Sequence, residues 1–177
     1  TTGKTLWSMN FAFDHSKMAV EILLSGDGKG DRFVVVNRDG SSYTIIAGGK
    51  RIASSSRALQ LNQYSDTYIA AESTGYYALY NFKGKKLTKT YQNAFDEVGQ
   101  NIYSHWLSNT EYEYIRCDAD GTNKVLFRVK CPNGRPGALP TDGAGVYALP
   151  TDEHTITCFD RFGTTLGTIK QDGEITM

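Results

Sequence analysis

The sequence predicts an all-β protein made of four similar antiparallel units, and three observations lead to this prediction. The 177 residues include 18 glycines, 11 tyrosines and 8 phenylalanines but only 4 prolines, a composition that suits strands and tight turns better than helices. No segment has the apolar periodicity of a helix. A turn pattern, Asn or Asp followed three positions later by Gly, recurs four times between apolar strands, at 37–40, 81–84, 118–121 and 160–163.

The recurring turn has a physical basis in its side chains. An oxygen of the Asn or Asp side chain accepts hydrogen bonds from backbone N–H groups two residues later, and glycine takes the positive φ at the end of the turn. The four turn glycines are separated by 44, 37 and 42 residues. A repeat of about forty residues that supplies three or four strands predicts an array of small antiparallel sheets.

Each unit is expected to hold an edge strand, two strands joined by a polar turn, and a last strand after the turn glycine. The four units form one domain over 1–177 and span 5–47, 51–92, 94–130 and 138–170. The expected strands, in chain order, are 6–13, 18–25, 32–37 and 42–46; then 52–61, 67–72, 76–82 and 86–91; then 94–98, 102–108, 111–118 and 124–129; and finally 138–142, 146–150, 155–160 and 164–169.

This strand–turn–strand repeat resembles the β-propeller repeat superfamily, with blades of the TolB, quinoprotein or WD-like kind. The resemblance covers nearly the whole chain, but the Gly-His and Trp-Asp signatures of WD40 blades are absent, so it indicates no closer family. It implies a β-propeller-like array of four antiparallel blades with three to four strands each, either a complete ring or half of a larger one. A β-sandwich with a similar number of strands is the alternative.

Charge and cysteine content narrow the class of partner and the compartment. The 19 basic and 19 acidic residues give zero net charge, which argues against nucleic acid as a partner. No apolar stretch approaches the roughly 20 residues that a membrane-spanning helix needs. The cysteines Cys117, Cys131 and Cys158 lack metal-binding spacing. Richness in Ser, Thr, Asn, Gly and Tyr favours an exported bacterial domain, extracytoplasmic or secreted, with a cytoplasmic location as the alternative. The start at Thr1 instead of Met fits a removed signal peptide or an excised domain.

No motif indicates a catalytic or metal site. The segment 2–5 lacks the preceding strand and following helix of a phosphate-binding loop, and 118–123 lacks the downstream Glu of a calcium loop. The histidines His15, His105 and His154 share no metal-ligand spacing, and no Gly-x-Ser-x-Gly elbow occurs. The sequence therefore predicts no cofactor and no metal.

Aromatic residues are expected mainly in the core between blades. Alternating strand positions place four of them there: Tyr76, Tyr80, Phe127 and Phe159. Four others gather around one hairpin, where core packing is the favoured interpretation and an exposed stacking platform is the alternative: Tyr103, Trp106, Tyr112 and Tyr114.

The propeller resemblance also sorts the loops by rim. The loops between the second and third strands (26–31, 73–75, 109–110 and 151–154) would share one rim with the connections 47–50 and 133–145, and the repeated glycine turns would lie at the other rim. In propellers, ligands meet the first of these rims. The predicted binding residues are Asp27, Lys29, Asp31, Arg32, Glu72, Trp106, Asn109, Glu111, Asp152, Glu153 and His154. Their acidic balance favours a cationic or peptide partner over one that carries phosphate.

The favoured function is a non-catalytic binding or scaffold module that recognises a protein, peptide or glycan through this rim. One alternative is a hydrolase or lyase that acts on glycans or peptides, with His105 or His154 as a proton shuttle beside a carboxylate. Another is a self-assembly module in which a homodimer completes a larger ring. Neither nucleic-acid binding nor membrane insertion is expected.

Overall fold

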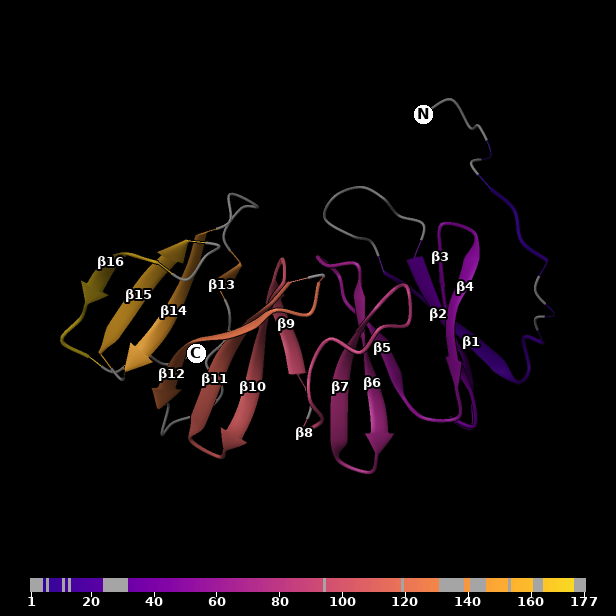
Figure 1. Cartoon of the computed structure of the whole chain (residues 1–177), viewed down its shortest axis with the longest axis horizontal. Helices are drawn as coiled ribbons and strands as arrows, with labels where there is room; N and C mark the ends of the chain where they lie inside the picture. Colours follow the sequence, from indigo (N-terminus) through magenta and orange to yellow (C-terminus); the bar gives the residue numbers. More distant parts are fainter. Residues whose placement is uncertain are drawn as a thin grey trace.

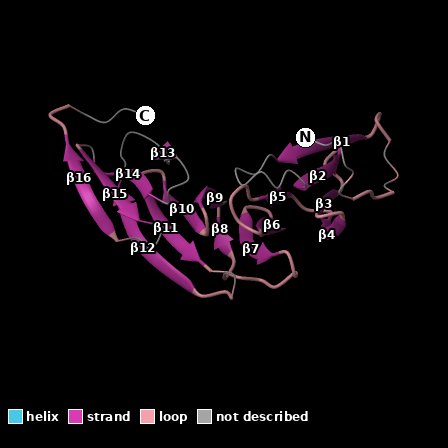
Figure 2. Ribbon diagram, turned by 90° about the horizontal axis from the view of Figure 1, so that it is seen from above, coloured by secondary structure: helices cyan, strands magenta, loops and turns pink. Residues whose placement is uncertain are grey.

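The chain consists of four four-stranded antiparallel sheets that follow one another in an arc (Figure 1 and Figure 2). We describe it from a computed structural model, which covers residues 5, 7–10, 12, 14–23, 32–93, 95–118, 120–130, 139–140, 146–152, 154–160 and 164–173. All the regular elements within this part of the chain are strands, and it contains no helix long and apolar enough to cross a membrane.

The strands follow chain order within every sheet. The first sheet holds β1 (Met18–Leu23), β2 (Arg32–Asn37), β3 (Tyr43–Ala47) and β4 (Lys50–Ser55); the second holds β5 (Leu59–Leu61), β6 (Thr67–Ser73), β7 (Tyr76–Asn81) and β8 (Tyr91–Gln92); the third holds β9 (Phe95–Gly99), β10 (Ile102–Ser108), β11 (Glu111–Cys117) and β12 (Asn123–Lys130); and the fourth holds β13 (Leu139–Pro140), β14 (Val146–Asp152), β15 (Thr155–Asp160) and β16 (Thr165–Lys170). Since each sheet packs on the next, the structure confirms the predicted array of antiparallel blades and not a two-sheet sandwich.

The repeated turns have the predicted geometry where the structure describes them. In three of them the glycine N–H donates to the carbonyl of the Asn or Asp at 2.8–2.9 Å. The three glycines, Gly40, Gly84 and Gly121, have φ values of 70°, 79° and 94°. In the second turn the Asn81 Oδ1 atom accepts from the N–H groups of Lys83 and Lys85, both at 3.0 Å. Turn chemistry alone therefore identified these positions correctly.

The strands that make up the first sheet are not the ones that the sequence predicts. No strand forms among the described residues of 6–13, and the expected strand 52–61 is divided between two sheets. Its first part extends β4, which closes the first sheet, and its last part is β5, which opens the second. The cause is a two-residue hairpin at Gly48 and Gly49, whose φ values of 55° and 71° give the twist that joins β3 tightly to β4.

This shift reverses the position of one repeated turn. In the first sheet the turn 37–40 joins the second and third strands, whereas in the second and third sheets the corresponding turns join the third and fourth. Because successive strands run in opposite directions, the turn 37–40 lies at the other end of its sheet from the turns 81–84 and 118–121.

Three apolar clusters fill the three interfaces between successive sheets. Between the first and second sheets lie Val34, Ile45, Leu59, Leu61 and Tyr68, with Tyr80 against them. Between the second and third lie Ile69, Leu79, Leu87, Tyr103, Ile115 and Cys117. Between the third and fourth lie Val98, Ile102, Tyr114 and Phe159, with Phe127 against them. The stability of the array therefore rests on contacts between blades, as in other repeat proteins.

The aromatic predictions hold with one exception. Tyr103 and Tyr114 are fully buried, Tyr112 is also buried, and Trp106 stacks on Tyr112 with ring centroids 6.1 Å apart. The favoured interpretation of this hairpin as core is thus confirmed. Tyr76 differs, because it lies at the tip of its blade, directly after Gly75, and is 44% exposed.

Candidate functional site

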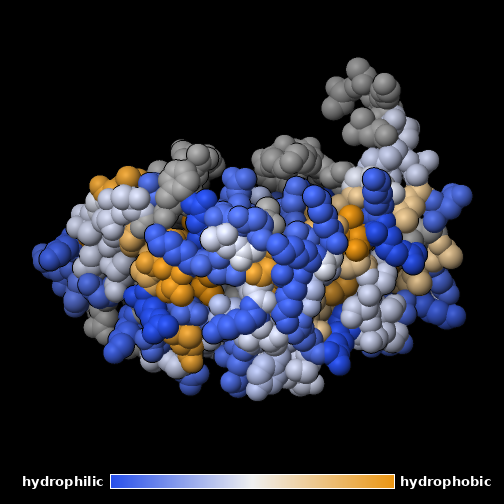
Figure 3. All heavy atoms as spheres, viewed as in Figure 1, coloured by the Kyte–Doolittle hydropathy of each residue, from blue (hydrophilic) through white to orange (hydrophobic). Residues whose placement is uncertain are grey.

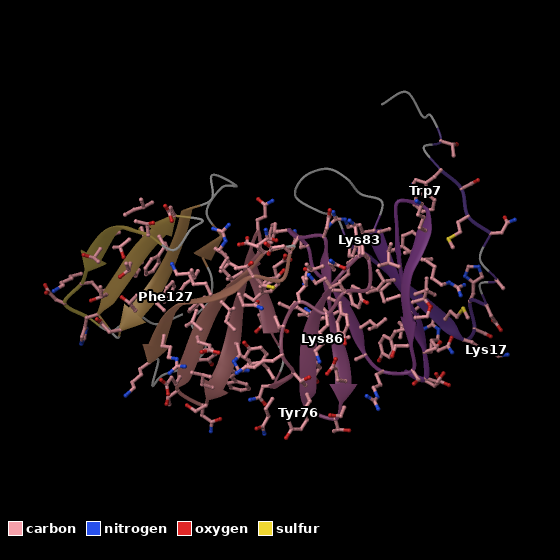
Figure 4. The ribbon with its side chains drawn as sticks, in the orientation of Figure 1. Trp7, Lys17, Tyr76, Lys83, Lys86 and Phe127 are labelled. Carbon is pink, nitrogen blue, oxygen red and sulfur yellow. The ribbon has the colours of Figure 1, made fainter. Side chains whose placement is uncertain are left out.

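The blades end in two rims that differ in how their loops are bonded. The lower rim consists of the tips 38–42, 73–76, 108–111 and 152–155, and the upper rim consists of the loops 48–49, 62–66, 82–86, 99–101 and 118–122. In Figure 4 the label of Tyr76 marks the lower rim and that of Lys83 the upper rim.

Hydrogen bonds between neighbouring blades join the loops of the upper rim. The Tyr64 N–H donates to Glu97 Oε2 at 2.8 Å, and the Asn101 N–H donates to Ser65 Oγ at 2.9 Å. Lys85 Nζ likewise donates to the Asp120 carbonyl of the next blade. Within the described residues, the lower-rim tips 73–76, 108–111 and 152–155 hydrogen-bond only inside their own blades. The lower rim therefore keeps its tips available to a partner.

The predicted binding residues divide between the two rims. Five of them lie at or beside the tips of the lower rim: Glu72, Asn109, Glu111, Asp152 and His154. Arg32 lies at the upper rim, because the first sheet is shifted by one strand. Trp106 lies inside β10, half-buried against Tyr112. Asp27, Lys29, Asp31 and Glu153 lie outside the described residues.

Arg32 joins the first blade to the second. Its side chain is 5% exposed, and its guanidinium donates to the Ser65 carbonyl at 3.3 Å and to the Asp66 carboxylate. The guanidinium carbon also lies 5.4 Å from the ring centroid of Phe82, within the range of a cation–π contact. These contacts give Arg32 a structural role between blades.

Glu72 is held by three side chains of its own blade. Its carboxylate accepts hydrogen bonds from Lys86 Nζ at 2.6 Å and from the hydroxyls of Thr90 and Tyr80. The bond from Lys86, followed by those from Thr90 and Tyr80, lowers the pKa of Glu72 from 4.5 to about 2. Glu72 thereby fixes the segment between β7 and β8, where the expected strand 86–91 is reduced to Tyr91–Gln92.

Replacing Glu72 by Gln is expected to lower the free energy of unfolding by an amount that depends on pH. Because the folded pKa lies below the ordinary value, the stabilising effect of Glu72 is present above about pH 4.5 and is lost as the pH falls towards 2. We expect the variant to unfold about 1 kcal/mol more easily than the wild type at pH 7. Urea unfolding at pH 7 and pH 2.5 measures this difference, and an equal difference at both values would contradict the role of the charge.

The remaining lower-rim residues are more open. Asp152 is exposed and accepts a hydrogen bond from the His154 N–H at 2.8 Å, which lowers the pKa of the Asp152 carboxyl. The exposed His154 ring places Nδ1 3.3 Å from the Gly173 carbonyl. Asn109 is exposed, and Glu111 is half-buried opposite Lys130. Carboxylates from two successive blades thus reach the same rim.

Sequence reasoning missed two exposed apolar residues of this rim. Tyr76 is 44% exposed at the tip of the second blade, and Leu107 is 37% exposed beside the tip of the third. The signal for Tyr76 was its position directly after Gly75 at the tip of a predicted hairpin, since connecting turns lie at the protein surface. An aromatic ring and an aliphatic side chain therefore accompany the carboxylates.

An acid–base pair of the kind required by the enzyme alternative, His105 with Glu113, lies inside the core. His105 Nδ1 lies 3.4 Å from Glu113 Oε1, and His105 Nε2 lies 2.8 Å from the Gln92 carbonyl. The two side chains are 6% and 7% exposed, so substrate has no access to them. A cavity of about 380 Å³ between the first and second blades is lined mainly by apolar residues and contains neither of them. No metal-ligand cluster occurs within the described residues.

No family model matches the chain, and no curated protein resembles it in sequence. Among solved structures it is similar to the crystal structure of HIRA(644-1017), with a TM-score of 0.51 and 10% identity over 88% of this chain and 54% of that one. It also matches the crystal structure of BamB from Moraxella catarrhalis, with a TM-score of 0.43 and 9% identity over 83% of this chain and 48% of that one. The chain spans about half the length of each of these structures. Its fold is therefore a partial β-propeller-like array of four blades.

Proposed function

We propose that the protein is a non-catalytic interaction module that binds a peptide segment with cationic side chains at the lower rim. The observation that carries this proposal is the composition of the lower rim, where the exposed Tyr76 and Leu107 and the carboxylates of Glu111 and Asp152 lie at or beside the tips of three successive blades. Such a mixture suits a peptide with both basic and apolar side chains.

The chemistry of these groups favours Lys or Arg in the partner. A carboxylate pairs with a cation, and the face of a tyrosine ring attracts a cation within about 6 Å. An exposed ion pair contributes up to about 1 kcal/mol, so several tips must act together to give useful affinity. A glycan is the second ligand class for this rim, because an exposed tyrosine can also stack on a sugar ring.

The extracytoplasmic location remains a prediction of composition. It accords with a module whose partner is a protein or glycan outside the cytoplasm.

Selection of peptides from a random displayed library on the immobilised protein tests the proposal. We expect enrichment of Lys- and Arg-containing sequences. We also expect Tyr76→Ala and Asp152→Asn each to lower the affinity for the selected peptide by about fivefold. Binding is measured by calorimetry at low and high salt, where screening reduces the affinity.

The upper rim provides matched control variants. Tyr64 is 43% exposed, close to the 44% of Tyr76, and Asp120 accepts a backbone N–H in its turn as Asp152 does. Tyr64→Ala and Asp120→Asn should leave peptide affinity unchanged. Equal losses from both rims, or enrichment of acidic peptides, would overturn the assignment.

A further inference from the structure

The side chain of Glu97 reaches from the third blade to the loop 62–66 of the second. Glu97 lies on β9 and is paired opposite Tyr103 of β10, so it projects from the face of the third sheet that packs on the second. Its Oε2 atom accepts a hydrogen bond from the Tyr64 N–H at 2.8 Å. Glu97 is therefore one of the groups that join the second and third blades at the upper rim.

The loop 62–66 is held by both neighbouring blades. From the first blade, the Arg32 guanidinium donates to the Ser65 carbonyl at 3.3 Å. From the third blade, the Asn101 N–H donates to Ser65 Oγ at 2.9 Å, and Ser65 is only 3% exposed. The loop is thus a joint between three successive blades, and a change in the bond that Glu97 accepts acts on this joint.

The two carboxylate oxygens of Glu97 have different surroundings. Oε2 accepts the Tyr64 N–H, whereas Oε1 is shielded from solvent and has no hydrogen-bond partner within the described residues. A buried carboxylate oxygen without a donor disfavours the charged form. Burial accordingly raises the pKa of Glu97 above 4.5, and hydrogen bonds from Ser65 and from backbone N–H groups of the loop oppose this effect only in part. A proton on Oε1 removes the charge and leaves Oε2 able to accept the Tyr64 N–H.

The other titratable groups near this interface are turned away, uncharged or in contact with groups of their own. Asp96 precedes Glu97 on β9 and points to the opposite face of the sheet. Asp66 is paired with the Arg32 guanidinium. Burial raises the pKa values of two neighbours, which are therefore uncharged at acid and neutral pH: Tyr103 and Cys117. Two further pairs in this interface contact each other: His105 with Glu113, and Lys85 with Asp120.

We propose that Glu97 is a pH-sensitive latch that joins the second and third blades more firmly when its carboxyl carries a proton. Hydrophilic residues form most of the surface along the upper edge of these two sheets (Figure 3), so the proton comes from solvent at this rim. Because the folded pKa lies above the ordinary value, the stabilising effect is complete below pH 4.5 and is lost as the pH rises through the folded pKa. The latch therefore acts in the opposite direction to Glu72, whose charged form is the stabilising one.

Urea unfolding of the wild type and of Glu97→Gln between pH 4 and pH 8 tests this proposal, since glutamine resembles the protonated carboxyl. We expect nearly equal unfolding midpoints at pH 4, and a midpoint for the variant that increasingly exceeds that of the wild type as the pH rises. Glu72→Gln is the matched control with the opposite sign, because that variant falls further behind the wild type as the pH rises from 2.5 to 7.

NMR titration of the Glu97 carboxyl carbon in the wild type gives a reading that needs no variant, and we expect a midpoint above 4.5. Amide exchange, corrected for its intrinsic pH dependence, locates the effect. The amides of Tyr64 and Asn101 should open less often as the pH is lowered, whereas the His154 amide at the lower rim should not change.

Each of three results contradicts the latch. These are a Glu97 titration midpoint at or below 4.5, a difference between wild type and Glu97→Gln that is the same at pH 4 and pH 8 or favours the wild type at the higher pH, and amide protection that changes equally at the two rims.

Discussion

Replacing Tyr103 by Ala is expected to lower the free energy of unfolding by about 3–5 kcal/mol, the usual cost of removing a large buried aromatic side chain. Tyr103 is fully buried in the cluster between the second and third blades, where it lies with Ile69 and Ile115. Its hydroxyl also forms a 2.8 Å hydrogen bond with the Thr67 hydroxyl of the neighbouring blade. Urea unfolding at neutral pH measures the loss.

Tyr103→Phe separates packing from hydrogen bonding. It keeps the ring and removes only the hydroxyl, so we expect a loss of about 1 kcal/mol. A loss from Tyr103→Ala no larger than that from Tyr103→Phe would show that the interface between these blades is not packed as described.

Replacing Arg32 by Ala is expected to cost about 2–3 kcal/mol, the second large effect. The change removes charge-assisted hydrogen bonds to Ser65 and Asp66 and the contact with the Phe82 ring. Because the side chain of Asp66 is 68% exposed, water can solvate its carboxylate in the variant, which keeps the cost below that of an isolated buried charge. Urea unfolding at neutral pH, together with peptide affinity, measures the effect.

Arg32→Lys serves as the conservative control. A lysine keeps the charge but lacks the planar guanidinium that donates to the Ser65 carbonyl and the Asp66 carboxylate at the same time. We therefore expect a loss of stability smaller than that of Arg32→Ala. Unchanged stability combined with lost peptide binding in Arg32→Ala would show that Arg32 contacts the ligand directly, against the role assigned here.

Local turn chemistry made the number of blades predictable. A turn oxygen and a positive-φ glycine act within four residues, so Asn81 and Gly84 reveal their turn without tertiary information. The boundary between the first two blades depended on tertiary contacts. Residues 52–61 look like one strand in sequence, but the Gly48–Gly49 hairpin pairs Lys50–Ser55 with β3 and leaves only Leu59–Leu61 for the next blade.

The positions of the proposed rim residues were predictable only where they followed from the strand order. Glu111 and Asp152 were placed correctly at the same end of their blades, because their units follow the repeat without a shift. The role of Arg32 depends on Ser65 and Asp66, 33 and 34 residues away in the sequence. No periodicity reports such a long-range contact, so burial of this charge could not be foreseen.

The most direct test of the binding rim is amide chemical-shift mapping by NMR with a selected basic peptide. We predict that the largest shift changes fall at the tips 73–76, 108–111 and 152–155, on three successive blades. Changes concentrated at 62–66, 82–86 and 99–101 would place the ligand on the upper rim and contradict the proposed function.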